Sequence, residues 1–464
     1  MLKSTSSSLP PTPFSISDNG TSDASEAIRS SDGEWSLLKQ LTVVTLGRGI
    51  GFALAIGTNI LLVRLLGPAE YGFLALSLAL ITMCIGIFSE ALDVAILRFL
   101  PLQLAANSGR AELYFLSAVI LKGIFMAGLI IAGFLAMDSV GTWLSLTEGR
   151  TELLGWTLVG VAGTMLLRSC VAYYQAMHQL RRFVYAELCH TLCKLIFVGS
   201  CAAMGVLTAA NAVAGLGLIA LVVGVITCGY LVKSEGITLK LVPEQTAELW
   251  HFTKWVMLSF TIATIYSRAD IPLLAHFRGA TEVGHYSAAI TLSSVSEIIL
   301  SFAGGAVTPK IMVWMEQGRM TEFLRRCLLY GIAPCLIAIG AVWILAEPVI
   351  GLLYSETYRP AVLLFQILST GTLLWCLALP LAAPLVCMHR PRWEVLQNIL
   401  VLLLMAGGSV LLIPSYGAIG IAYLVSSLKI LTTVISLWLA FKVAATVQVP
   451  HGMTGAHGRE GGML

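Results

Sequence analysis

Ionisable side chains lie inside several apolar stretches of this 464-residue chain. On insertion scales a charged residue at the centre of a membrane helix costs about 2.5–3.5 kcal/mol, so such residues normally face a cavity or a partner. The basic ones are Arg48, Lys122, Arg168, Lys194, Arg268 and Lys429, and the acidic ones are Glu90, Asp93, Glu187, Asp270 and Glu297. These residues are the candidates for binding a charged substrate or for moving ions.

Three of the acids have a basic neighbour close by in the sequence. The pairs are Glu187–Lys194, Asp93–Arg98 and Asp270–Arg268. The seven-residue spacing of the first pair puts both side chains on one helical face. The basic residues left without a local partner are then chiefly Arg48, Lys122, Arg168 and Lys429. A cavity lined by them would hold an anion, and arginine suits a phosphate because it donates two parallel hydrogen bonds.

We therefore expect a cationic substrate cavity and a second, mixed set of residues that serve gating or ion coupling. The cavity set is Arg48, Lys122, Arg168, Lys194 and Lys429; the gating set is Glu90, Asp93, Arg268, Asp270 and Glu297. The alternative is that each charge forms a structural pair or extends to the membrane interface. Glu90 and Asp93, one helical turn apart, form either a proton or cation site or a local salt-bridge network.

Composition places these residues in a membrane protein. The chain is 57% hydrophobic and 11% charged, whereas ordinary soluble domains carry about 25% charged residues. Twelve stretches approach or exceed the roughly 20 residues that span a bilayer. They are 42–66, 71–100, 112–136, 152–177, 184–206, 212–233, 251–277, 284–308, 326–346, 360–387, 393–413 and 418–441. We expect an all-α integral membrane protein.

Other classes find no support in the sequence. The net charge of +3 is too small for a nucleic-acid-binding protein, and no module of that kind is visible. The ten cysteines are scattered through apolar runs. We find no GxxxxGK[ST] phosphate loop, no HExxH motif and no Cys/His cluster, so no cofactor or metal is expected.

One hairpin occurs twice. The segment RLLGPAEYGFLALSLAL, Arg64 to Leu80, returns 212 residues later inside the hairpin Ser259 to Leu292. The matching positions are Gly67 with Gly279, Glu70 with Glu282 and Gly72 with Gly284. Such repeats are common in transporters, which carry the substrate path between two halves. We expect two six-helix lobes produced by duplication.

The lobes and tails follow from this division. We expect a disordered cytoplasmic tail at 1–34, lobes at 35–233 and 251–441, a cytoplasmic linker at 234–250 and a flexible cytoplasmic tail at 442–464. With the N-terminus inside, eighteen Lys and Arg residues fall on the cytoplasmic side and four on the opposite side. This excess predicts that both termini are cytoplasmic.

Two segments resemble a known family. The stretch NILLVRLLGPAEYGFLALSLAL followed by EALDVAILRFLP at 90–101 resembles the opening helices of Wzx-type polysaccharide exporters. These belong to the multidrug/oligosaccharidyl-lipid/polysaccharide (MOP) flippase superfamily. The later YSRADIPLLAHFRGATEVGHYSAA resembles that family's seventh-helix segment, through Arg268, Asp270, Gly279, Gly284 and Tyr286. The resemblance covers roughly residues 36–442.

The resemblance implies a MATE-like bundle of about twelve helices that works by alternating access in the bacterial cytoplasmic membrane. It implies export of undecaprenyl-pyrophosphate-linked oligosaccharide, for exopolysaccharide, O-antigen or capsule. Other polysaccharide-assembly membrane proteins are candidate partners. The first alternative is a MATE-like antiporter of cationic drugs or metabolites, which would use an acidic cavity. The second is a membrane enzyme, namely a glycan polymerase, ligase or acyltransferase, but the outward loops are too short for such a catalytic domain.

Overall fold

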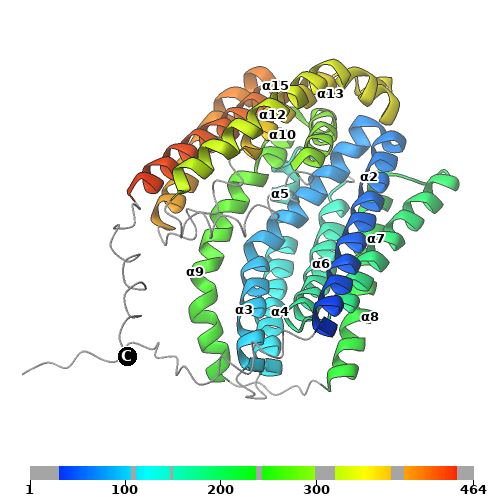
Figure 1. Cartoon of the computed structure of the whole chain (residues 1–464). Coiled ribbons are helices and arrows are strands. Elements are labelled where there is room, and N and C mark those ends of the chain that lie inside the picture. Colours follow the sequence, from blue (N-terminus) through cyan, green and yellow to red (C-terminus); the bar gives the residue numbers. More distant parts are fainter. Residues whose placement is uncertain are drawn as a thin grey trace, which may run out of the picture.

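The computed structural model describes residues 31–105, 111–146, 150–236, 243–297, 319–377 and 391–446, and all secondary structure in these ranges is helical. Figure 1 shows one bundle, coloured from blue to green, and a second set of helices coloured from yellow to red. Of the predicted tails, 1–34 and 442–464, residues 1–30 and 447–464 lie outside the described ranges, whereas 31–34 and 442–446 are helical.

The described part of the first half holds seven helices. They are α2 (Ser31–Phe88), α3 (Glu90–Ala105), α4 (Ala111–Leu135), α5 (Met137–Trp143), α6 (Glu152–Ala176), α7 (Leu180–Ala203) and α8 (Ala209–Glu235). The long α2 is not straight, because Gly67 adopts φ 72° and ψ 170° and Pro68 follows it. Proline removes a backbone donor and glycine tolerates positive φ, so the chain turns here. This bend separates the first two predicted spans.

The second half repeats this organisation. Its described elements are α9 (Pro243–Arg268), α10 (Asp270–Arg278), a helix at 280–297, α12 (Met320–Leu353), the 3-10 turn η1 (Glu356–Tyr358), α13 (Ala361–Cys376) and α15 (Pro391–Thr446). Gly279, with φ 80°, interrupts the helical conformation between α10 and the next helix, as Gly67 does in the first half. The long α15 bends at Gly417, with φ 56°.

Seven described helices are long and apolar enough to cross a membrane. Two of them, Thr42–Phe88 and Leu396–Lys442, contain 47 residues each. At 1.5 Å per residue such a helix measures about 70 Å, more than twice the bilayer core, so each supplies two crossings on either side of its bend. Together with α9–α10, the helix at 280–297 and α13, the described residues cover ten of the twelve predicted crossings and parts of the other two, 284–308 and 360–387, whose remaining residues lie outside the described ranges.

Helix α9 contacts helices of both lobes. The start of α9 packs against α3 and α4: the Phe252 ring lies edge-on to Phe99, with ring centroids 5.6 Å apart, and the Arg98 guanidinium lies 4.4 Å from the Phe252 centroid. Beyond the end of α9, the Arg278 side chain of α10 donates to the Ile413 and Pro414 carbonyl oxygens of α15 at 3.2 and 2.8 Å. Figure 1 shows α9 standing beside α3.

Candidate functional site: a buried charge network and a neighbouring cavity

The centre of the site is an ion pair between Asp93 of α3 and Lys122 of α4. The Lys122 side chain is 5% exposed and that of Asp93 is 10% exposed. Lys122 also donates to the Ser169 hydroxyl at 2.9 Å, and the Ser89 hydroxyl donates to Asp93 at 3.3 Å. A charge in an apolar interior is tolerated only when it is paired and hydrogen-bonded, and this pair meets both conditions.

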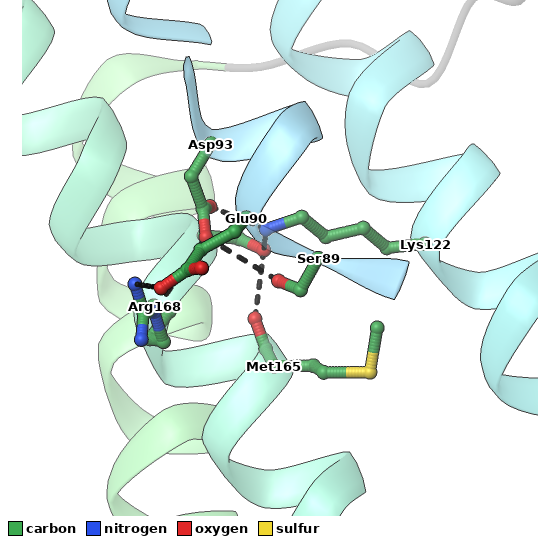
Figure 2. A network of polar contacts seen from close by, with 7 residues as sticks. Ser89, Glu90, Asp93, Lys122, Met165 and Arg168 are labelled. Carbon is green, nitrogen blue, oxygen red and sulfur yellow. Dashed lines mark hydrogen bonds and ion pairs between the residues drawn. The ribbon is translucent and has the colours of Figure 1, made fainter. Parts of the chain in front are cut away.

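Arg168 of α6 extends the network towards solvent. Its Nη2 donates to Glu90 at 3.1 Å, and its Nε lies 3.6 Å from Asp93. The Arg168 and Glu90 side chains are 43% and 33% exposed, so the network has a buried half and an accessible half. Figure 2 shows Lys122 and Arg168 approaching Asp93 from different helices. Two cations and two carboxylates leave the network without net charge.

Arg168 also lines a cavity of about 320 Å³ between α2, α6 and α7. Arg48, Glu187, His190 and Thr191 contribute to the same wall. The Arg48 guanidinium lies 5.1 Å from the centroid of the Phe183 ring. Among the described residues, no partner donates to or accepts from the buried His190 Nε2. The cavity wall formed by the described residues therefore combines two guanidinium groups with one carboxylate and a hydroxyl, so its cations exceed its anions by one.

A second charged site lies in the other lobe. Lys429 of α15 donates to the Thr372 hydroxyl of α13 at 2.9 Å and lies 3.9 Å from Glu297. Its ammonium group is 5.5 Å from the centroid of the Trp375 ring. Ser293 donates to the same Thr372 hydroxyl at 3.0 Å. The two lobes are thus similar at their second crossings. Asp93 in the first lobe and Glu297 in the second each face a cation from a different helix.

The Asp270 carboxylate is buried and hydrogen-bonded within the second lobe. It is 5% exposed, accepts a hydrogen bond from the Tyr286 hydroxyl at 2.8 Å and accepts another from the Ile271 amide at 2.9 Å. The bond from Tyr286 connects α10 to the helix at 280–297. The sequence pattern that contains Arg268, Asp270 and Tyr286 therefore includes a direct contact between the last two residues.

Three of the four basic residues that lack a local partner in the sequence have a carboxylate partner on another helix, which is the alternative that the sequence left open. Lys122, Arg168 and Lys429 each face a carboxylate from another helix. Arg48 has an aromatic ring and the nearby Glu187 instead. The substrate roles predicted for these residues and for Lys194 remain a prediction, as do the gating roles of the five others.

The predicted local pairs are wrong. Among the described residues, no ion pair within 4 Å joins Asp93 to Arg98, Asp270 to Arg268, or Glu187 to Lys194. A separation of five residues rotates a side chain about 140° around the helix, and two residues rotate it about 200°. A seven-residue separation keeps the face but adds about 10 Å of rise. Only spacings of three or four bring side chains together.

Sequence reasoning missed the hydroxyl groups of the two charged sites. Ser89, Ser169 and Thr372 each touch a charged group in the membrane interior. The available signal was a serine directly beside an ionisable residue in an apolar run, as in Ser89–Glu90 and Arg168–Ser169.

The fold and the site define a class of protein. The described residues form a two-lobed helical membrane protein with charged groups inside each lobe. Residues 37–313, more than half of the chain, match the family described as "Polysaccharide biosynthesis protein". The chain belongs to this family, which confirms the Wzx-like resemblance seen in the sequence.

Solved structures share the fold at low sequence identity. A structure described as "Lipid II flippase MurJ, inward closed conformation" has a TM-score of 0.71 and 10% identity, covering 87% of this chain and 90% of that one. An inward-facing multidrug resistance MATE family transporter has a TM-score of 0.70 and 13% identity, with 86% and 96% covered. The Vibrio cholerae MATE transporter VcmN in its bent form has a TM-score of 0.57 and 16% identity, with 89% and 97% covered. A search of curated proteins returned no match.

Proposed function

We propose that this transporter moves undecaprenyl-pyrophosphate-linked oligosaccharide from the inner to the outer leaflet of a bacterial cytoplasmic membrane. The observation that carries the proposal is the position of Arg168, which belongs to the charge network and also lines the cavity. A diphosphate accepts paired hydrogen bonds from guanidinium groups, and Arg48 lies in the wall of the same cavity.

The size of the cavity fits the headgroup. Small-molecule sites measure about 300–1,000 Å³, and a cavity of about 320 Å³ accommodates a diphosphate and an adjoining sugar. The rest of the oligosaccharide extends beyond the cavity, and the lipid chain stays in the bilayer. Lys429, on the other lobe, supplies a cation when the lobes close on the substrate.

Anion binding at Arg168 is an exchange of partners. Asp93 keeps Lys122 and Ser89 as partners, whereas Glu90 has Arg168. When a diphosphate binds Arg168, Glu90 loses its cation and the lone carboxylate becomes costly in a low-dielectric site. The exchange therefore ties substrate binding to a change in charge at Glu90, which accounts for the gating or ion-coupling role expected of this residue.

The same residues separate this proposal from its alternative. A MATE-like antiporter of cationic compounds would use the carboxylates Glu90, Asp93 and Glu297 as its binding groups. Amide substitutions at Glu90 and Glu297, which lie outside the buried ion pair, would then abolish drug efflux and spare glycan export. A flippase requires the opposite pattern, with the larger loss at Arg48 and Arg168. The positive residues on the predicted cytoplasmic side support an orientation with both termini inside.

The test uses cells deleted for the gene and complemented with wild type, Arg168→Gln, Lys194→Gln or the control Arg359→Gln. Arg359 pairs with Glu347 in an exposed place away from the cavity. Mass spectrometry quantifies the undecaprenyl-linked glycan, and an impermeant label reports its leaflet. We expect the glycan to accumulate on the cytoplasmic leaflet in the deletion and with Arg168→Gln, and export to return with wild type and Arg359→Gln. A normal leaflet distribution in the deletion, in a strain without redundant flippases, would refute the proposal.

A further inference from the structure

The two repeated turns touch each other across the lobes. A Cβ atom built on Gly72 would overlap the carbonyl oxygen of Ala280, and one built on Gly284 would overlap the carbonyl oxygen of Pro68. Each glycine therefore faces the turn of the other lobe, and the contact is reciprocal. We call this the turn contact; it joins residues 68–72 to residues 280–284.

The turn contact requires glycine because both obstructing atoms belong to the backbone. A flexible side chain can move aside, but a helical backbone moves only with its helix. Two other glycines in α2, Gly49 and Gly57, have no heavy atom within 4 Å of such a Cβ. Glycine at positions 72 and 284 is thus explained by the approach of the two lobes rather than by the needs of either helix.

Each turn is fixed to the last helix of its own lobe. The Glu70 carboxylate accepts a hydrogen bond from the Ala209 amide, at the start of α8, at 2.8 Å. The Glu282 carboxylate accepts one from the Ala418 amide, directly after the bend in α15, also at 2.8 Å. A carboxylate at such a helix start satisfies a backbone donor and the helix dipole together. Each turn therefore moves with the helix bundle of its own lobe.

The layer below the turn contact is closed. Tyr71, Val283 and Tyr286 are 2%, 0% and 0% exposed. The cavity is elsewhere: Arg48 precedes Gly67 by 19 positions, which is about 28 Å of helix. The charge distribution assigns the turns to the outer side. The turn contact thus closes the end of the protein opposite to the cytoplasm.

We propose that the turn contact is the outward gate of the transporter, and that Gly72 and Gly284 are the gate residues whose separation opens it. Glu70 and Glu282 transmit the opening to the sixth helix of each lobe. This inference rests on the transporter class and not on the lipid-linked substrate proposed above. Its test therefore reads the state of the gate without any substrate.

The first experiment uses Ser287→Cys as a reporter. Ser287 is 5% exposed, lies one turn below Gly284, and its hydroxyl has no hydrogen-bond partner among the described residues. A membrane-impermeant maleimide is applied to cells and to inverted vesicles, and mass spectrometry measures labelling of the peptide that contains position 287. The reporter is combined with Gly72→Ala, Gly284→Ala, both together, or the control Gly57→Ala.

We expect each alanine at the gate to raise labelling from the outer side about fivefold or more. This is the size of change that a shift between two conformations typically produces. Gly57→Ala should label like wild type. The double variant should label little more than either single variant. One added methyl group already separates the two turns, so a second one has no contact left to disturb. Labelling at the wild-type rate in both single variants, or effects that multiply in the double variant, would overturn the proposal.

A second experiment keeps both glycines and so avoids any loss of folding. Ala69 and Thr281 are exposed neighbours of the contacting residues, and Ala69→Cys with Thr281→Cys allows a reversible disulfide between the turns. With Ser287→Cys present, oxidation should reduce outer labelling at position 287 to background, and reduction should restore it. If the disulfide forms and labelling at position 287 continues unchanged, the turns are not the gate.

Discussion

Lys122 and Asp93 form a buried ion pair although 29 positions separate them in the sequence. Their side chains are 5% and 10% exposed, and Arg168 reaches the same carboxylate from a third helix. The pair connects α3 to α4 and places Ser169 of α6 beside it. Both charges are therefore part of the packing of the first lobe, and neither can be removed alone without leaving the other buried.

Removing one member of this pair should destabilise the protein strongly. Breaking a buried pair costs about 3–5 kcal/mol, because one charge remains without its partner. We expect Lys122→Met to lower the melting temperature of the purified protein clearly, and Asp93→Asn to do the same. The double variant should be more stable than the sum of the two single losses predicts. Thermal unfolding, followed by intrinsic fluorescence, compares wild type, the two single variants and the double variant.

The exposed pair Arg359–Glu347 provides the control. Its side chains are 72% and 66% exposed, and exposed pairs contribute about 0–1 kcal/mol. Arg359→Gln should therefore leave the melting temperature nearly unchanged. Strictly additive losses at Lys122 and Asp93 would mean that the two charges do not depend on each other.

The Glu70 carboxylate should make stability depend on pH. Burial raises its pKa, but the hydrogen bond from Ala209 and the pairing with Arg150 outweigh this and hold the pKa below its usual 4.5. A carboxylate with a depressed pKa contributes stability that is present above 4.5 and is lost as the pH falls through the folded-state value. We expect wild type to lose more stability than Glu70→Gln between about pH 7 and about pH 4.

Melting curves across this range measure the difference between the two proteins. Glu347→Gln serves as the matched control, since Glu347 is an exposed carboxylate with an arginine partner. It should follow the wild-type curve throughout. If Glu70→Gln follows that curve as well, Glu70 does not contribute the proposed pH dependence.

The elements of the fold were predictable from the sequence because membrane crossings are long apolar runs. The repeated turn was also readable, since Gly67 and Gly279 both adopt a positive φ that favours glycine. What the sequence did not reveal was that the two turns contact each other. A repeat predicts two similar local structures, but the distance between the copies depends on how the lobes pack.

Charge pairing was the part that sequence reasoning failed to predict. Asp93 and Arg98 are close in the sequence and of opposite charge, which suggests a pair. Their five-residue spacing, however, directs them to different sides of the helix. Arg98 instead covers the ring of Phe252 on α9. The true partners of Asp93 come from α4 and α6, and only the packing of three helices brings them together.

The Phe252 ring should be a principal contact between α9 and the first lobe. It is partly buried and is packed by Phe99 and Arg98, and truncation of a packed aromatic ring removes its buried apolar contacts. Trp255, three residues later on the same helix, is 66% exposed. We expect Phe252→Ala to lower the melting temperature much more than Trp255→Ala does. Equal losses would show that α9 does not depend on this packing.

Glu90 should restrain anion binding, because it occupies the guanidinium group that a diphosphate would use. Its carboxylate accepts a hydrogen bond from Arg168 at 3.1 Å. Glu90→Gln removes this competing charge and leaves Lys122 and Arg168 facing only Asp93. We expect the purified variant in nanodiscs to bind inorganic pyrophosphate about tenfold more tightly than wild type, which corresponds to about 1.4 kcal/mol. Isothermal titration calorimetry measures the dissociation constants.

Arg168→Lys is the complementary change. Lysine keeps the positive charge but cannot donate the two parallel hydrogen bonds that arginine gives a phosphate. We expect it to bind pyrophosphate more weakly than wild type, whereas Glu347→Gln, at an exposed carboxylate, should bind like wild type. Weaker binding by Glu90→Gln would contradict the exchange of partners at Arg168. In that case Glu90 would be a ligand in its own right, and cationic substrates would be the next to measure.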